Sequence, residues 1–154
     1  MSGWYAKVSD DMSTIPKCII YYTKEYEDAR VELTFEGDSI EKHAAKLPGL
    51  VEYRFNQLQE IEAILEFLNI KVQQIRSKKF RQYLEGYNRA LSSRDAEKYV
   101  DGEPEVVDMM YIVNEFALVR NKYLGIAKGL DQKSWAVSNV IKLRCAGLDD
   151  ARID

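Results

Sequence analysis

The sequence predicts a mainly α-helical protein of the α+β class, with two long amphipathic helices, shorter helices, a small N-terminal β-hairpin and an oligomeric assembly. Only 3 prolines and 8 glycines occur in 154 residues, which suits long helices better than a sandwich with many turns. Apolar residues recur three or four positions apart through two long segments, the spacing of a helix with one buried face. Near the N-terminus the spacing changes to alternation, which is typical of a half-buried strand.

An arm and a β-hairpin are expected in residues 1–37, ahead of a helical domain in residues 38–154. Residues 1–16 are small, polar and acidic, and we expect them to be loosely ordered. Residues 18–23 read CIIYYT, a β-branched and aromatic run that favours a strand. The second strand is predicted at residues 31–36, where apolar and polar side chains alternate. Because a lone hairpin is marginally stable, it is expected to pack on a helix or on a neighbouring subunit.

The first long helix is predicted to follow a short one. Asp38 and Glu41 form a fair capping box, and the short helix is expected to stop before Pro48 because the residue ahead of a proline resists the α conformation. From Leu50 the spacing predicts a helix that ends near Gly86, with an apolar stripe of Phe55, Leu58, Ile61, Ile64, Leu65, Leu68, Val72 and Ile75. A helix so long exceeds the diameter of a small domain. One chain is therefore expected to be too small to cover it, which predicts self-association.

The second long helix is predicted to begin at Pro104, a residue that suits a first helical turn. Breaks are expected at residues 88–94 and 101–104, with a short helix between them. The stripe of this second helix consists of Val106, Met109, Met110, Val113, Phe116, Ala117, Val119, Leu124, Ile126 and Ala127. Gly129 is expected to cap it, and a separate last helix is expected at residues 135–146.

Charge is strongly segregated along the chain. The net charge of −3 argues against a nucleic-acid partner, but residues 71–98 carry a net +5 and residues 117–144 also carry +5, while residues 1–70 carry −6 and residues 99–116 carry −5. Attraction to phosphate acts locally, within about 8–10 Å at ordinary ionic strength. The blocks are therefore compatible with contact to DNA or with the pairing of opposite blocks between subunits.

The strongest local feature is a basic and aromatic segment near the end of the first long helix. Its candidate DNA-binding residues are Arg76, Lys78, Lys79, Phe80, Arg81 and Tyr83. Cations that track a backbone and aromatic rings that stack on bases are what sequence-tolerant binding to single strands requires. The alternative is that both aromatic rings belong to the core and the cations only solvate a helix end, where they suit its dipole.

A second basic set surrounds the predicted last helix, at Lys128, Lys133, Lys142 and Arg144. Trp135 lies among these cations, and we expect it to be a packing anchor rather than a base-stacking residue.

The sequence carries no signal of catalysis, so we expect no enzyme, no cofactor and no metal. His43 is the only histidine and is expected at the surface, without neighbours in metal-ligand spacing. Cys18 and Cys145 are far apart and unpaired in pattern, which favours a reduced compartment, the cytoplasm. No apolar run approaches the roughly 18 residues of a spanning helix, and the N-terminus lacks a signal pattern, so no membrane association is expected.

Three segments carry a resemblance to a known family. Residues 78–86 read KKFRQYLEG, residues 99–107 read YVDGEPEVV, and residues 133–144 read KSWAVSNVIKLR, with Gly147 following. Over roughly residues 48–147 this pattern resembles the UvsY family of recombination mediators from T-even-type phages. The first segment is similar to the part of that family associated with single-strand binding, the second to an acidic turn that opens the penultimate helix, and the third to the family's terminal run.

The chain also departs from that pattern. Ser134 and Ser138 stand where the family has glycine and lysine, and the predicted hairpin has no counterpart. The resemblance implies a ring-like homo-oligomer that binds single-stranded DNA, a single-strand-binding protein and a RecA-like recombinase.

The function we expect from the sequence is therefore that of a mediator in DNA recombination and repair, which helps load the recombinase onto covered strands. Residues 38–154 would form its oligomerisation and DNA-binding domain. The alternatives are a structural or virion-assembly oligomer, or a small protein-binding adaptor without nucleic-acid activity.

Overall fold

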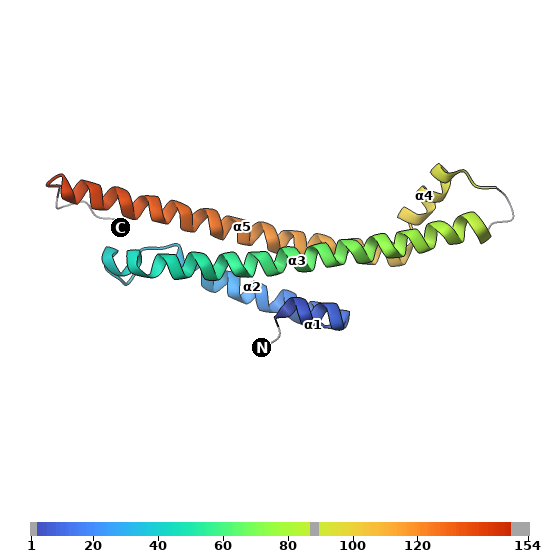
Figure 1. Ribbon diagram of the computed structural model, residues 1–154, viewed down its shortest axis with the longest axis horizontal. Coiled ribbons are helices and arrows are strands. Elements are labelled where there is room, and N and C mark those ends of the chain that lie inside the picture. Colours follow the sequence, from blue (N-terminus) through green and yellow to red (C-terminus); the bar gives the residue numbers. More distant parts are fainter. Residues whose placement is uncertain (1–2, 87–89, 149–154) are drawn as a thin grey trace.

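The computed structural model describes residues 3–86 and 90–148, and within them every regular element is helical. The order is α1 (Trp4–Asp10), a 3-10 turn η1 (Met12–Thr14), α2 (Ile15–Glu32), α3 (Ile40–Gly86), α4 (Ser93–Asp101) and α5 (Pro104–Cys145). Figure 1 shows an elongated molecule in which α3 and α5 lie side by side and antiparallel, with α1 and α2 on one side of the pair and α4 at the far end.

The two long helices cover each other within one chain. Ion pairs join α3 to α5 at both ends of their contact, from Glu41 to Arg144 at 3.1 Å and from Lys79 to Glu105 at 3.5 Å. Between these ends, Ile61 and Leu68 of the predicted stripe are fully buried. The expectation that one chain is too small to cover the stripe is therefore wrong for most of it, because the return of the chain as α5 supplies the partner helix; Phe55, at the start of the stripe, stays 52% exposed.

The predicted β-hairpin is wrong, because most of its residues form helix α2. Read with a helical period, the buried residues of α2 are Ile15, Cys18, Tyr22 and Ala29, three, four and seven positions apart. This face packs into the groove between α3 and α5, and its burial outweighs the β propensity of residues 18–23, which is a weak and context-dependent preference. The alternation at residues 31–36 falls on the end of α2 and the turn that follows, where Gly37 has a positive φ of 83°.

Residues 3–16 are held by contacts with α3, so the expectation that residues 1–16 are loosely ordered is wrong for them, while residues 1 and 2 lie outside the described residues. The backbone N–H of Tyr5 donates a hydrogen bond to Glu60 Oε1 at 3.0 Å, so a carboxylate of α3 caps the first turn of α1. A Cβ at Gly3 would lie 2.2 Å from the same oxygen, which explains the glycine there. Val8 of α1 is fully buried in the same core as Ile61 of α3.

Helix α3 runs through Pro48 instead of stopping before it, and it ends at Gly86 as predicted. A proline inside a helix removes one backbone hydrogen bond and costs about 3 kcal/mol in stability. Here the helix continues because residues on both sides of the proline are anchored in the core. Leu47 packs in a cluster with Ile126 and Leu130 of α5, and Arg54 is buried against α2.

Helix α4 and the start of α5 at Pro104 lie where the sequence predicts a short helix and a second long one. Gly129, however, does not cap α5, and no separate last helix exists, because α5 continues to Cys145. A Cβ at Gly129 would lie 2.8 Å from Leu33 Cδ2, so this glycine allows the end of α2 to approach closely. The capping glycine is Gly147, with φ 84° and a Schellman pair of backbone hydrogen bonds, one of them from Leu148 N–H to the Leu143 carbonyl at 3.1 Å.

None of the helices in the described ranges is long and apolar enough to cross a bilayer.

Candidate functional site

The predicted DNA-binding segment occupies the last turns of α3, beside α4 and the first turn of α5. With 3.6 residues per turn, its six side chains divide between two faces of the helix. The face toward α4 and α5 carries Arg76, Lys79, Phe80 and Tyr83, all partly buried, whereas Lys78 and Arg81 point outward and are exposed. The structure therefore does not bring the six residues together into one surface.

The inward-facing cations are paired with acidic residues of the same chain. Arg76 Nη1 lies 2.5 Å from Asp101 Oδ1, and Lys79 Nζ lies 3.7 Å from Glu103 and 3.5 Å from Glu105. We call residues 101–105, which join α4 to α5, the acidic junction. Opposite charge blocks do pair, and in this structure they pair within one chain at the point where α4 leads into α5.

The two aromatic residues of the segment pack against neighbouring elements. Tyr83 donates a hydrogen bond from its hydroxyl to Glu103, and its ring stacks on that of Tyr99, with centroids 5.5 Å apart. Phe80 and Leu84 of α3 face Val100 of α4 across a groove of about 480 Å³. This geometry favours the packing interpretation for both rings in the chain as it is folded.

The outward face of α3 has a composition that the sequence reasoning missed. Between residues 66 and 85 it lines a shallow depression of about 880 Å³. We call it the polar face of α3. Its amides are Asn69, Gln73, Gln74 and Gln82, its charged members are Lys78, Arg81, Glu66 and Glu85, and Ile70 and Ser77 complete the lining. At 1.5 Å per residue it extends roughly 28 Å. Four amides on one side of a long helix were the signal that could have revealed it.

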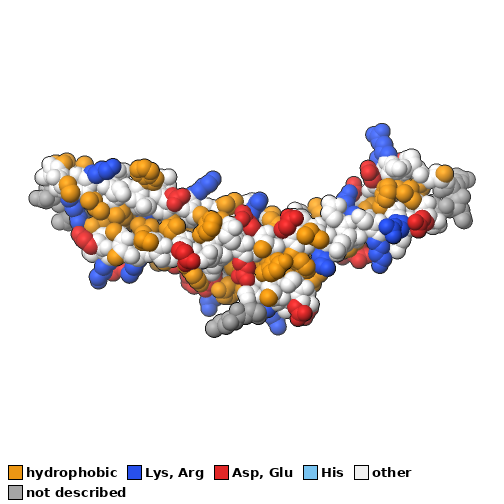
Figure 2. Space-filling model, viewed as in Figure 1, with side chains coloured by type: hydrophobic (Ala, Val, Ile, Leu, Met, Phe, Trp, Pro, Cys, Tyr) orange, Lys and Arg blue, Asp and Glu red, His pale blue; other side chains and the backbone are white. Residues whose placement is uncertain are grey.

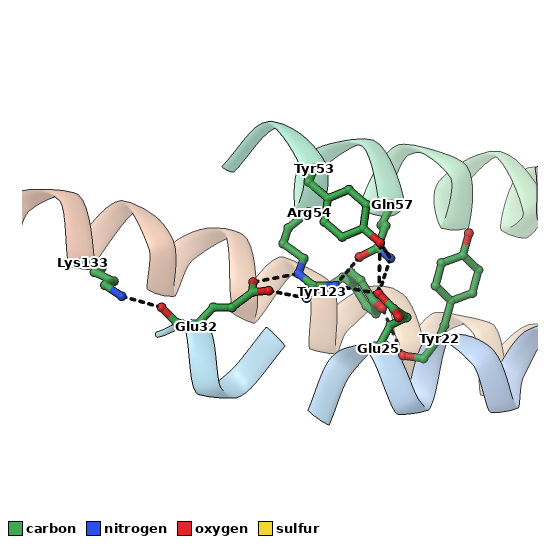
Figure 3. A network of polar contacts seen from close by, with 8 residues as sticks. All are labelled: Tyr22, Glu25, Glu32, Tyr53, Arg54, Gln57, Tyr123 and Lys133. Carbon is green, nitrogen blue, oxygen red and sulfur yellow. Dashed lines mark hydrogen bonds and ion pairs between the residues drawn. The ribbon is translucent and has the colours of Figure 1, made fainter. Parts of the chain in front are cut away.

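A buried polar network holds α2 to α3 (Figure 3). Arg54 is only 4% exposed and binds Glu32 through two parallel hydrogen bonds, from Nε at 2.9 Å and from Nη2 at 2.6 Å. Its Nη1 donates to Glu25 at 3.1 Å and to Gln57 Oε1 at 2.8 Å. Burial alone lowers the pKa of the guanidinium, but the hydrogen bonds and charges of Glu32 and Glu25 outweigh it and raise that pKa.

The network also shifts the pKa of Glu25, in the downward direction. Burial alone raises the pKa of its carboxyl, but hydrogen bonds from Gln57, Arg54 and Tyr53, together with the Arg54 charge, hold the pKa below its usual value. On the other side of the network, the Tyr123 hydroxyl of α5 donates to the Tyr22 carbonyl at 3.1 Å. Arg54 and its partners therefore serve to bind three helices together, a structural role.

Lys133, one of the second basic set, is a structural residue. It is 5% exposed and donates to the carbonyls of Glu32 and Thr34, both at 2.7 Å, so it caps the C-terminal end of α2. Burial lowers the pKa of this lysine. Its Nζ also lies 3.1 Å from Nδ1 of His43, which is buried, so the expectation of a surface histidine is wrong. An ammonium held in this way is not available to DNA.

Trp135, expected to be a packing anchor, is 64% exposed in the chain, so that prediction is wrong at the level of one subunit.

The remaining reactive side chains of the described residues form no further site. Cys18 is buried and Cys145 exposed, and both are free thiols. Over the described ranges, no group of three or more His, Cys, Asp or Glu side chains is placed to hold a metal ion.

Comparisons with protein-family models, with curated proteins and with solved structures find no match to this chain. The likeness to the UvsY family rests on the three segments alone.

Proposed function

We propose that this protein is a non-enzymatic, self-associating DNA-binding protein that takes single strands on the polar face of α3. By the resemblance to UvsY, we propose further that it is a recombination mediator, which weakens the grip of a single-strand-binding protein and offers the strand to a RecA-like recombinase in the host cytoplasm. Such a role requires no cofactor from this chain, since filament growth draws its energy from the recombinase.

The observation that carries the proposal is the polar face of α3. Lys78 and Arg81 lie one turn apart and are exposed, and the amides of Gln74 and Gln82 flank them. The two carboxylates of the face, Glu66 and Glu85, stand at its two ends. Exposed cations on a helix attract phosphates without regard to sequence, and side-chain amides supply hydrogen bonds to sugar, phosphate or base edges. A face roughly 28 Å long is enough for several extended nucleotides.

Self-association is supported by apolar side chains that the chain leaves uncovered. On α5, Tyr111 and Leu118 lie two turns apart on one side of the helix and are 67% and 64% exposed, and Trp135, further along on another side, is 64% exposed. On the face shown in Figure 2, hydrophobic side chains lie open to solvent along much of the molecule. Uncovered patches of large apolar side chains mark association surfaces. Several weak strand-binding faces in one assembly would act together through multivalency.

The test reverses the two outward cations. Lys78→Glu with Arg81→Glu is compared with the parent for binding to a fluorescent oligothymidine, by anisotropy at several salt concentrations. Lys17→Glu with Lys24→Glu, an exposed pair on α2, makes the same charge change elsewhere and is the matched control. Each lost phosphate contact on a single strand lowers the log–log salt slope by about 0.7, so the α3 variant is expected to lose up to about 1.4. Equal binding by both variants would rule out the polar face as the binding site.

A structural oligomer or protein-binding adaptor is the second candidate. The pairing of Arg76 and Lys79 with the acidic junction favours it, because two of the four cations of the basic segment then form ion pairs within the chain instead of contacting DNA. This candidate predicts an oligomer by light scattering with no retention of single strands, even at low salt.

A further inference from the structure

The acidic junction and the predicted DNA segment share the same cations. Asp101 forms an ion pair with Arg76, and Glu103 and Glu105 both form ion pairs with Lys79, with nitrogen–oxygen distances of 2.5 to 3.7 Å. A phosphate of a bound strand would have to displace these carboxylates to reach either cation. On the end of the molecule that carries α4, Figure 2 shows Lys and Arg side chains interspersed with Asp and Glu.

The buried apolar part of the contact between α4 and α3 is small. Helix α4 has nine residues, of which only Ala96 and Val100 are buried. The carboxylates of Asp101 and Glu105 are 57% and 58% exposed, so their ion pairs are weak and screened by salt. The groove beside Phe80 also shows that α4 does not close fully on α3. The hydrogen bond from Tyr83 to Glu103, the stacking of Tyr83 on Tyr99 and the ion pair of Lys79 with Glu103, whose side chains are 23% and 22% exposed, must also be broken when this segment opens. A segment with only two buried apolar side chains still opens at a lower free-energy cost than the core does.

We propose that α4 and the acidic junction form an intramolecular strap that competes with single-stranded DNA for Arg76 and Lys79. This inference rests on the proposed function and describes how that same site is regulated. With the strap closed, a strand meets only the two outward cations. Once the strand displaces the carboxylates, Arg76 and Lys79 on the neighbouring face of α3 become available to its phosphates in addition to the two outward cations, and the covering of Phe80 by Val100 is removed. The strap thereby keeps the protein from holding DNA tightly until a strand is already engaged on the polar face.

Neutralising the strap tests the idea directly. In the variant Asp101→Asn, Glu103→Gln, Glu105→Gln the cations keep neutral neighbours of the same size. Affinity for oligothymidine is expected to rise about three- to tenfold, the factor that corresponds to two or three exposed ion pairs. The salt slope is expected to rise by up to about 1.4, since two more cations become available to phosphates.

The control removes three acidic charges far from the site. Asp10→Asn, Asp28→Asn, Glu36→Gln changes the net charge equally, on exposed residues of the N-terminal half. It is expected to raise affinity less than twofold and to leave the salt slope unchanged. Circular dichroism at 222 nm checks that both variants keep the parent's helix content. If strap and control variants gain equally, simple charge accounts for the effect and the strap is overturned, while the proposed function stands.

A second measurement uses the unmodified protein. Hydrogen exchange of the amides in residues 93–101 is followed with and without excess oligothymidine. A displaced strap predicts faster exchange in the bound state, and unchanged or slower exchange overturns the inference. If neither the parent nor the strap variant binds single strands at low salt, the proposed function itself fails. If only the strap variant binds, both proposals are supported.

Discussion

The Arg54 network offers the sharpest test of what holds the N-terminal helices to the long pair. Replacing Arg54 with methionine keeps most of the side-chain volume but removes the only cation that faces Glu25 and Glu32 within the described contacts. Removing one partner of a buried ion pair costs about 3–5 kcal/mol, because the other charge is left unpaired. The side chains of the two carboxylates are 23% and 24% exposed, so water reaches them in part and the loss should lie near the lower end, about 3 kcal/mol.

The assay is urea unfolding followed by circular dichroism at one fixed protein concentration, since self-association raises apparent stability. A loss of about 3 kcal/mol corresponds to a fall in Tm of roughly 6–12 °C for a chain of this size. Adding Glu25→Gln and Glu32→Gln to Arg54→Met should recover about half of the loss, because the uncompensated charges are then gone.

The control is Arg30→Met, which breaks an exposed ion pair with Glu27 on the same helix as the two carboxylates. It should change stability by no more than about 0.5 kcal/mol. If Arg54→Met costs as little as Arg30→Met, or if the additional glutamines bring no recovery, the network is not what holds α2 in place.

Three further outcomes follow from the structure. The pKa of Glu25 is lower in the folded protein than the unfolded value of about 4.3. The contribution of Glu25 to stability is therefore complete above about pH 4.3 and is lost as the pH falls through the folded pKa. Urea midpoints should be flat near neutrality and decline below about pH 4, and stability that rises on acidification would contradict this. Burial raises the pKa of the Cys18 thiol to about 12, so a thiol reagent at pH 7.5 should label one cysteine, Cys145, and reach Cys18 only in denaturant; two fast labels would refute the burial. Gly125→Ala, with no atom within 4 Å of the new Cβ, should stabilise by about 0.5–1 kcal/mol, whereas Gly129→Ala, with an atom at 2.8 Å, should gain less or lose; equal effects in thermal melts would dismiss the close approach at Gly129.

The long helices were predictable where one segment's own chemistry decides the outcome. Pro104 begins α5, as local propensity indicates, and α3 is helical up to Gly86, the last residue described before position 90. Helix α2 was mispredicted because the β-branched and aromatic run of residues 18–23 was weighted above the helical spacing of Ile15, Cys18, Tyr22 and Ala29, which is also present in the sequence. The cap on α1 is harder still to predict from the sequence, because Glu60 lies 55 residues from Tyr5, whose backbone N–H donates to it.

The basic segment is recognisable from the sequence as a local feature, but the division of its side chains between two surfaces was overlooked. The helical period alone assigns Lys78 and Arg81 to one face and Arg76 and Lys79 to another. What no period can supply is the register in which α4 and α5 return along α3. That register decides which carboxylates meet which cations, and it depends on the whole antiparallel pair.

The capping of α2 by Lys133 has a consequence for the synthesis of the chain. The Glu32 carbonyl and the Lys133 ammonium that binds it are 101 residues apart. During synthesis α2 therefore emerges from the ribosome well before the second half of α5, which completes the burial of α2. At about 5–20 residues per second this interval lasts roughly 5–20 s. During that time the CIIYYT run of residues 18–23 is exposed without its groove, in a sequence whose local preference is for strand. Nascent chains should therefore be most prone to aggregation between the emergence of α2 and that of the second half of α5.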